Sequence, residues 1–451
     1  MLEQGRSRLS CDEGGRVLDR LAGLEKIISP EAVKQSLLAT GRVGQRCCVL
    51  THEVMLWIVL GMGILSDLPI RQVFKHARRL RGGEASPHRS SLCLARQRLG
   101  VAPVRHLFQE TVRALARPDT PGASYRGLRL VAIDGVVYNL PDSKANEKAF
   151  GRPSGGHRGE GAFPQIRKVS LVELGTHVEL AMVAKRIACG ETTVVEALWR
   201  HIPKDALLLE DRGFFSYKSW KRALHENIAV LARVKNQLVL RPIQYLTDGS
   251  YLAKIYPTSR DRDKDQHGIV VRVIRYKLDD PQRVGHEEVH ILLTTLLDAA
   301  QYPAAELISL YHERWELELG YDEVKTDLLD RQEAIRSKTP SGVMQEIWAV
   351  GLVYNLVRLE MERVADEAQV KPNRISFKMA LRLIRDEWMW TTGTGSPGAI
   401  PKHLRRLRED IAQFVLPERR PRAYPRVVKI KMSNYCLLYT SPSPRDGLLS
   451  R

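Results

Sequence analysis

Residues 128–135 read LRLVAIDG, and residues 206–213 read ALLLEDRG. Each stretch is a short apolar run that leads into an acidic residue, Asp134 in the first and Asp211 in the second. Apolar runs of this length are typical of strands that are buried on both faces of a sheet. A carboxylate at the end of such a strand has its backbone position fixed by the sheet. The two stretches therefore predict a buried sheet with acids where its strands end.

The sequence around these two stretches predicts an α/β fold. Residues 168–173 and 177–184 alternate or run apolar on either side of Gly175, which indicates an antiparallel hairpin. Residues 217–226 have the spacing of a helix, and residues 228–234 read IAVLARV, a further strand. Three strands, a strand that ends on an acid, a helix and a strand follow one another, which is an α/β arrangement.

Charge is the unusual feature of the composition. The 451 residues hold 70 Lys and Arg against 52 Asp and Glu, a formal net charge of +18. This balance suits a polyanion, usually nucleic acid, although a basic protein without such a partner is the alternative. Two basic stretches, 71–83 and 90–100, lie among helices predicted over residues 17–117, and the second is expected to present Arg96 and Arg98. We predict that both stretches contact DNA; a solvated helical face explains either one alone equally well.

Zinc sites and membrane segments are not expected. The six cysteines form no CxxC pair, and no Cys/His cluster has zinc spacing, so free thiols in a reducing compartment are predicted. The most apolar stretch, residues 54–65, is too short to span a bilayer and predicts a buried helix. Because the N-terminus also lacks the apolar core of a signal peptide, we expect a cytoplasmic protein.

A helix predicted after Pro303 carries the strongest local signal. Four polar side chains recur along it at offsets of 0, 3, 7 and 14: Tyr311, Arg314, Glu318 and Lys325. At about 100° per residue these positions fall within an arc of roughly 60°. One helix face therefore presents a hydroxyl, a guanidinium, a carboxylate and an ammonium group. Taken alone, the face is also explained by a surface helix with an i,i+4 pair of Arg314 and Glu318.

Three carboxylates can converge from two strands and one helix: Asp134, Asp211 and Glu318. Mg²⁺ prefers hard oxygen ligands and combines a few carboxylates with phosphate oxygens of the substrate. Two such ions about 4 Å apart activate the attacking oxygen and stabilise the leaving one. Arg314 and Lys325 would offset the negative charge of the acids, so that a phosphate backbone can approach. A turn explains either aspartate alone, because Asp-Gly and Asp-Arg-Gly are common turn sequences, whereas the combination favours a metal site.

Around these residues the sequence resembles a DDE transposase of the insertion-sequence-four type. The principal matches are 131–142 (VAIDGVVYNLPD), 207–217 (LLLEDRGFFSY) and 311–325 (YHERWELELGYDEVK), and the last fits the family's Y-(2)-R-(3)-E-(6)-K signature. Supporting matches are residues 95–100, 161–177, 335–358 and 424–435. Glu210 directly precedes Asp211, so two registers are possible. Asp211 is chosen because Arg-Gly-Phe follows it, as in the family.

The resemblance implies an α/β fold with an RNase H-like mixed sheet and flanking helices. The implied division is a helical N-terminal DNA-binding domain at 1–120, a catalytic core at 125–235 and 288–365, a β-rich insertion at 236–287, a helical and basic C-terminal region at 366–435, and a tail at 436–451. The tail departs from the family pattern and contains CLLYTSPSPRD, which resembles a translated sequencing-library adapter. We therefore expect the tail to be non-native.

The resemblance also implies the chemistry of the site. Asp134, Asp211 and Glu318 would bind two Mg²⁺ ions, for which Mn²⁺ would substitute. A set of neighbouring side chains would bind DNA: Tyr311, Arg314, Trp315, Lys325 and Arg212. Trp315 could stack on a base flipped out of the duplex, and a packed core tryptophan is an equal alternative.

The implied activity is metal-dependent phosphodiester cleavage and strand transfer at the ends of an insertion sequence, in cut-and-paste DNA transposition. The expected partners are double-stranded DNA, as terminal inverted repeats and target, and a second copy of the chain in a homodimeric synaptic complex. The expected location is the bacterial cytoplasm, at the nucleoid. Two alternatives stay open: an inactive DNA-binding remnant of a transposase, and an RNase H-like structure-specific nuclease.

Overall fold

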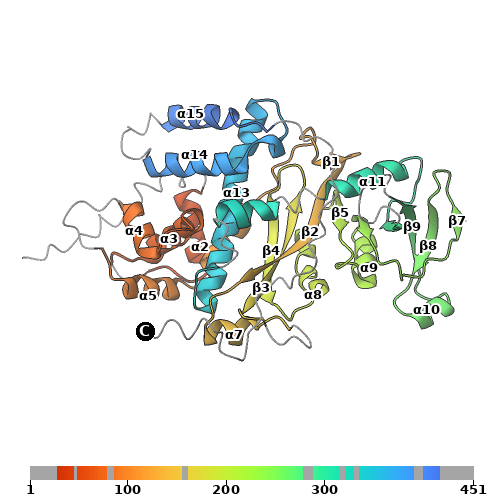
Figure 1. Ribbon diagram of the computed structural model, residues 1–451, viewed down its shortest axis with the longest axis horizontal. Helices are drawn as coiled ribbons and strands as arrows, with labels where there is room; N and C mark the ends of the chain where they lie inside the picture. Colours follow the sequence, from red (N-terminus) through yellow and green to blue (C-terminus); the bar gives the residue numbers. More distant parts are fainter. Residues whose placement is uncertain are drawn as a thin grey trace, which may run out of the picture.

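The computed structural model describes residues 28–44, 48–78, 86–154, 161–277, 288–314, 320–329, 335–390 and 400–416. Within these ranges a mixed sheet lies beside a helical body built jointly from N-terminal and C-terminal segments (Figure 1). Two predicted site residues, Glu318 and Trp315, lie outside the described residues, as does the tail at 436–451.

The sheet has the strand order β4-β3-β2-β5-β6-β10-β9-β8-β7, with β1 paired to β2 outside this path. The strands are β1 (Ser124–Tyr125), β2 (Leu128–Asn139), β3 (Gln165–Glu173), β4 (Glu179–Arg186), β5 (Ala206–Glu210), β6 (Ala229–Arg233), β7 (Gln244–Tyr245), β8 (Tyr251–Ile255), β9 (Ile269–Tyr276) and β10 (His290–Thr294). β2, β5 and β6 are parallel, and the other paired strands are antiparallel. The mixed sheet confirms the predicted α/β class, and β3 with β4 forms the predicted hairpin.

Several helices of the described chain are short. They are α7 (Lys144–Phe150), α8 (Glu191–Val195), η3 (Trp199–His201), α9 (Tyr217–His225), α10 (Ser259–Asp263), α11 (Ala304–Glu313), η4 (Glu323–Leu328) and η5 (Pro372–Arg374). Successive side chains of a strand point to opposite faces of the sheet. Leu208 of β5 accordingly packs in one apolar cluster with Trp220 of α9, and Leu207 packs in another with Leu310 of α11. The two helices therefore cover opposite faces of β5.

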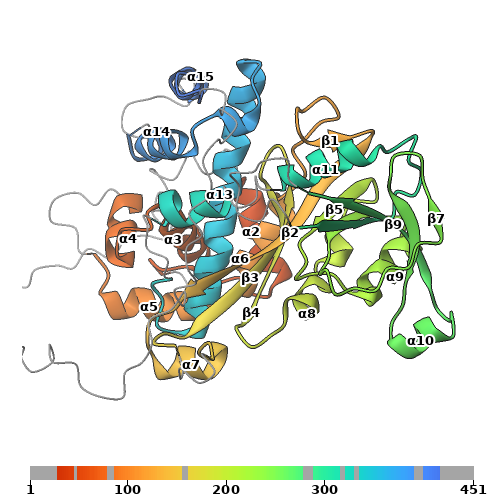
Figure 2. The ribbon, with the colours of Figure 1, turned by 45° about the vertical axis from the view of Figure 1, so that its right-hand side comes forward.

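The helical body has α13 (Pro340–Glu367) at its centre, as Figure 2 shows. Around it lie α2 (Pro30–Ala39), α3 (His52–Ile64), α4 (Ile70–Arg78), α5 (Arg89–Leu99), α6 (Ala102–Thr111), α14 (Phe377–Trp390) and α15 (Ile400–Ala412). Their apolar side chains form one continuous cluster, which also includes Val136 and Tyr138 of β2. The described N-terminal helices thus share a core with the helices that follow the sheet.

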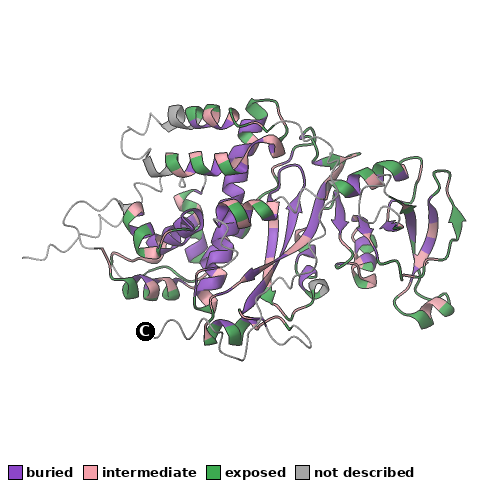
Figure 3. Ribbon diagram, viewed as in Figure 1, coloured by how far each residue is buried: buried purple, intermediate pink, exposed green. Residues whose placement is uncertain are grey.

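The helix α3 has no polar face, because residues 54–64 are all buried. Such a helix belongs in the interior of a protein, and α3 packs directly on α13 (Figure 3). The apolar stretch is therefore a buried helix, as predicted. Among the described helices none is long and apolar enough to cross a membrane.

The chemistry of their first turns explains where three of these helices begin. The hydroxyls of Ser29, Thr51 and Thr339 each accept a hydrogen bond from a backbone N–H in the first turn of α2, α3 and α13. Proline also occupies the first turn of α2 and α13, where its missing N–H costs nothing.

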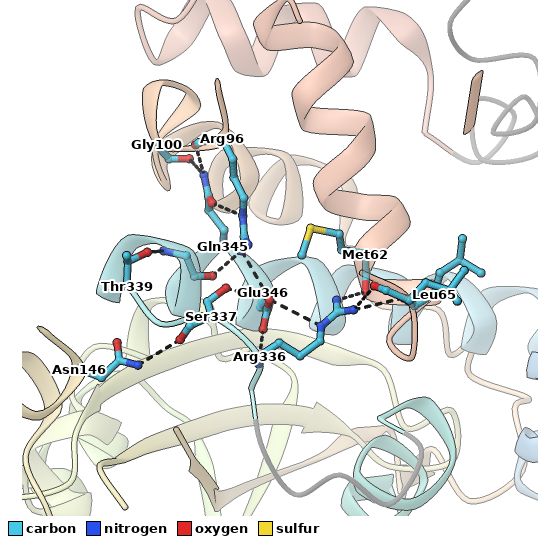
Figure 4. A network of polar contacts seen from close by, with 12 residues as sticks. Met62, Leu65, Arg96, Gly100, Asn146, Arg336, Ser337, Thr339, Gln345 and Glu346 are labelled. Carbon is cyan, nitrogen blue, oxygen red and sulfur yellow. Dashed lines mark hydrogen bonds and ion pairs between the residues drawn. The ribbon is translucent and has the colours of Figure 1, made fainter. Parts of the chain in front are cut away.

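A polar network joins the N-terminal helices to α13 (Figure 4). Arg96 of α5 donates to Gln345 Oε1 at 2.8 Å and to the Gly342 carbonyl at 2.7 Å. Arg336 donates to carbonyl groups at and beyond the end of α3, and both guanidinium groups lie 3.7 Å from Glu346. The expectation that α5 presents Arg96 outward is therefore wrong, because α13 supplies buried acceptors for this side chain; Arg98 is exposed.

The long helix predicted after Pro303 has a different form. It begins at Ala304, as expected, but α11 ends at Glu313. The described part of the chain then shows a π-helical turn, η4, over Glu323–Leu328. A π-helix closes i→i+5 hydrogen bonds, so the spacing of an α-helix does not apply through Lys325. The single arc predicted for the four polar side chains is therefore not a property of one regular helix.

Candidate active site

Asp134 and Asp211 lie side by side, because the parallel strands β2 and β5 set their register. Ile133 pairs with Glu210, so that the next residue of each chain segment is an aspartate. β5 ends at Glu210, whereas β2 continues to Asn139. The two carboxylates predicted from separate stretches, 77 residues apart in sequence (211 − 134), thus meet at the end of β5.

Tyr311 of α11 and Arg314, which directly follows this helix, contact these acids. The Tyr311 hydroxyl lies 3.4 Å from Asp211 Oδ1 and 3.4 Å from the Glu210 carbonyl oxygen, as a donor to both. Arg314 Nη1 lies 3.7 Å from Asp134 Oδ2, and its guanidinium carbon lies 5.8 Å from the centre of the Tyr311 ring. The predicted Tyr, Arg and two Asp residues therefore form one cluster.

The electrostatics of this cluster keep Arg314 charged. Burial opposes the charge, but Tyr311, Asp211 and Asp134 together raise the pKa of Arg314 above its ordinary value. Burial also raises the pKa of the Tyr311 hydroxyl, which is 6% exposed. The site thus combines two carboxylates, a permanent cation and a neutral phenol.

The backbone of Asp134 is also held in place. Gly135 N–H donates to Asp134 Oδ1 at 2.7 Å, and the Tyr321 hydroxyl donates to the Asp134 carbonyl oxygen at 2.8 Å. Tyr321 belongs to the short helical segment that leads into η4, so this segment contacts β2 at the acid itself.

A cleft of about 960 Å³ runs from Asp134 along the part of β2 that β5 does not cover. Lys325 of η4 lines this cleft together with Asp134, as the grouping of the site residues predicted. Two further cations, Arg152 and Arg167, also line it. Neither was predicted as a site residue, although Arg167 lies in one of the matching stretches.

The donor set around Asp134 suits a hard divalent cation, because carboxylate oxygens are the ligands that Mg²⁺ prefers. In the part of the chain that the structure describes, no group of three His, Cys, Asp or Glu could hold a metal ion. The third predicted ligand, Glu318, falls outside that part. Arg212 follows Asp211 directly, and its side chain is exposed.

Comparison with known proteins identifies the family. A family model described as "Insertion element 4 transposase N-terminal" matches residues 18–109, and one described as "Transposase DDE domain" matches residues 125–356. The chain is 34% identical over 421 residues to the transposase InsG for insertion sequence element IS4 of Escherichia coli, covering 92% of this chain and 93% of that protein. The chain belongs to the IS4 family of DDE transposases. It is also 29% identical over 170 residues to the putative transposase InsZ of Escherichia coli, covering 37% of this chain and 55% of that protein.

Membership of the IS4 family confirms three predictions. The chain is a DNA transposase, an enzyme of the DDE type, and its mixed sheet is the RNase H-like fold of the DDE domain. DNA binding and the use of divalent metal ions belong to the family. None of the comparisons favours an inactive remnant or a structure-specific nuclease.

The structure separates Asp211 from its acidic neighbour in this IS4-family chain. Glu210 is fully buried in β5 and belongs to the face that α9 covers, whereas Asp211 contacts Tyr311 of α11. Neither carboxyl oxygen of Glu210 has a hydrogen-bond partner among the described residues. Burial raises the pKa of Glu210 to about 8, and the nearby Trp220 indole opposes this only in part. Only Asp211 therefore stands beside Asp134.

Proposed function

We propose that this transposase cleaves and joins DNA strands at the ends of an insertion sequence with two divalent ions, Mg²⁺ with Mn²⁺ as a substitute, bound by Asp134, Asp211 and Glu318. The observation that carries the proposal is the adjacency of Asp134 and Asp211 on parallel strands, with Arg314 at 3.7 Å from the first. Glu318 enters from its place in the Y-R-E-K signature. When bound, such ions lower the pKa of the attacking water or hydroxyl and stabilise the leaving oxygen.

The side chains of the site have separate tasks in this proposal. Tyr311 donates to Asp211 and so fixes the orientation of that carboxylate. Arg314 offsets the charge of both aspartates, which lets a phosphodiester approach them. Lys325, on the wall of the cleft, binds the phosphate next to the scissile one. Arg212 and Trp315 also contact DNA, with Trp315 stacked on an unpaired base.

The proposed partners are the terminal inverted repeats, the target duplex and a second copy of the chain in the synaptic complex. The name of the IS4 relative, which refers to an insertion sequence element, supports the first of these. The domain boundaries at 120, 235, 287 and 365 and an association with the nucleoid belong to the same proposal. Because the described N-terminal helices share a core with α13, DNA bound to them would have a fixed position relative to the sheet.

Purified protein, Mg²⁺ and a duplex that carries the element's terminal repeat test the proposal. Ala at Asp134, Asp211 or Glu318 should abolish cleavage while binding of the duplex stays close to that of the wild type. An alanine variant that still cleaves would remove that residue from the site. The repeat itself can be found by searching the DNA on either side of the gene for inverted copies.

A further inference from the structure

A buried polar cluster lies behind the active site, where η4 packs against α13. Glu323, the first residue of η4, forms an ion pair with Arg358 and accepts a hydrogen bond from the Tyr354 hydroxyl at 3.0 Å. Arg358 also contacts the Tyr354 hydroxyl at 3.1 Å and His177 Nδ1 at 2.7 Å. Its side chain is 1% exposed. One guanidinium therefore contacts η4, the β3–β4 turn and its own helix.

This ion pair is charged although Arg358 is buried and the Glu323 side chain is only 19% exposed. Burial alone would raise the pKa of Glu323, but Arg358 and His177 hold it at about 2. Burial would likewise lower the pKa of Arg358, and Glu323 with Tyr354 keeps it above its ordinary value. The guanidinium also lies 5.5 Å and 5.3 Å from the ring centres of Tyr354 and Phe377. Removing the Glu323 carboxylate would leave the buried guanidinium of Arg358 unpaired, which costs several kcal/mol.

The turn that this ion pair contacts also reaches the active site. Tyr321, two residues before Glu323, donates to the Asp134 carbonyl oxygen, and Lys325, two residues after it, lines the cleft beside Asp134. The turn is π-helical, a rare geometry that recurs at functional sites. Tertiary contacts must therefore stabilise it. In the described chain these include the ion pair, the burial of Val324 and Leu328, and hydrogen bonds from the Tyr354 hydroxyl to Glu323 and from the Ser66 hydroxyl to the Leu328 carbonyl oxygen.

We propose that Arg358 is a positioning residue for DNA cleavage: through Glu323 it fixes the π-helical turn, so that Tyr321 and Lys325 keep their places against Asp134. The inference rests on the proposed function of Asp134. Arginine suits the task because its planar fork donates in several fixed directions at once, whereas the ammonium group of lysine is a compact point charge.

The test replaces the ion pair instead of breaking it. A Glu323→Leu/Arg358→Met double variant removes both charges, and a buried ion pair replaced by apolar residues of similar size often leaves stability unchanged. We expect an unchanged thermal midpoint, a kcat lowered at least about tenfold, and a raised KM for the terminal-repeat duplex, because Lys325 leaves its place together with the turn. Arg358→Lys should fall between the wild type and the double variant in both kcat and KM.

The matched control is a second ion pair of α13 in which one partner is buried. Glu360, which is 2% exposed, contacts Arg408 of α15 at 3.3 Å on a side of the helix away from η4. Glu360→Leu/Arg408→Met should retain the kcat of the wild type. A Glu323/Arg358 double variant with wild-type kcat would reduce the pair to a purely structural role. If the double variant fails to fold, Arg358→Lys decides alone, since a wild-type kcat there overturns the proposal.

Asp134→Ala, measured beside these variants, separates the two proposals. If the wild type cleaves and Asp134→Ala does not, the proposed active site stands, and the Arg358 variants test positioning alone. If Asp134→Ala cleaves like the wild type, the proposed active site fails whatever the Arg358 variants do.

Discussion

The Nη1 atom of Arg314 lies 3.7 Å from Asp134 Oδ2, and the charge of Arg314 also interacts with Asp211 on the neighbouring chain segment. The Arg314 side chain is 13% exposed and that of Asp134 21%. A cation so placed is largely neutralised by the protein's own acids before any DNA binds. Its main contribution should therefore come at the reacting phosphate, where negative charge develops, and less in the general attraction of DNA.

Arg314→Ala should accordingly lower kcat by at least about tenfold and leave the salt dependence of DNA binding unchanged. Single-turnover cleavage and binding isotherms over a range of salt concentrations measure the two quantities. Arg314→Lys is the matched variant and should retain part of the rate, because it keeps the charge without the fork. A flatter salt dependence in Arg314→Ala would instead mean that Arg314 pairs with a phosphate in the bound state.

Lys325, unlike Arg314, is predicted to contribute to the affinity for DNA and to its salt dependence. It lines the open cleft, and no ion pair engages it among the described residues. Lys325→Ala should weaken binding of the terminal-repeat duplex and flatten the plot of log affinity against log salt by about 0.9, the value for one lost phosphate contact. Lys218→Ala is the control, since Lys218 is exposed on α9, which covers the other face of the sheet. An equal change in both variants would argue against a contact in the cleft.

Local pattern explains why the two aspartates could be predicted. Each follows a short, mostly apolar run, and neighbouring parallel strands then bring the two runs side by side. The succession of strands and helices along the chain, the hairpin of β3 and β4 and the start of α11 at Ala304 follow from patterns of the same short range. These features depend on residues close together in the sequence, where periodicity and turn residues are informative.

Contacts between distant segments explain what the sequence did not predict. Arg96 looked like a residue of an exposed basic stretch, and its acceptors Gly342 and Gln345 lie about 250 positions away. The first residue of the π-helical turn, Glu323, pairs with Arg358 of another helix. Folding alone brings such partners together. Helical spacing in the sequence therefore predicted that the helix beginning at Ala304 continues as a regular α-helix through Lys325.

Because the side chain of Arg96 is only 12% exposed, we predict that its replacement lowers the stability of the protein and leaves its affinity for DNA unchanged. Arg96→Met leaves Glu346, which is 5% exposed, with one cation fewer and the Gly342 carbonyl without its donor, so the free energy of unfolding should fall by about 2–4 kcal/mol. Chemical denaturation measures this loss. Arg98→Ala on the same helix, where the side chain is exposed, should be neutral for stability. A stable Arg96→Met protein with weaker DNA binding would restore α5 as the DNA-contacting face.

Glu210 predicts how stability depends on pH. Its pKa is about 8 in the folded protein against an ordinary value of 4.5, because burial disfavours the charged form. Between these two values the unfolded chain releases a proton that the folded protein keeps, so this group's contribution is full below pH 4.5 and declines as pH rises towards 8. Glu210→Gln, which is neutral throughout, should match the wild type near pH 4.5 and exceed it by several kcal/mol near pH 8. Urea denaturation at the two pH values measures the difference, with the exposed Glu31→Gln as a control that should show none. Parallel pH profiles for Glu210→Gln and the wild type would mean that Glu210 ionises within the folded protein and that another group compensates its charge.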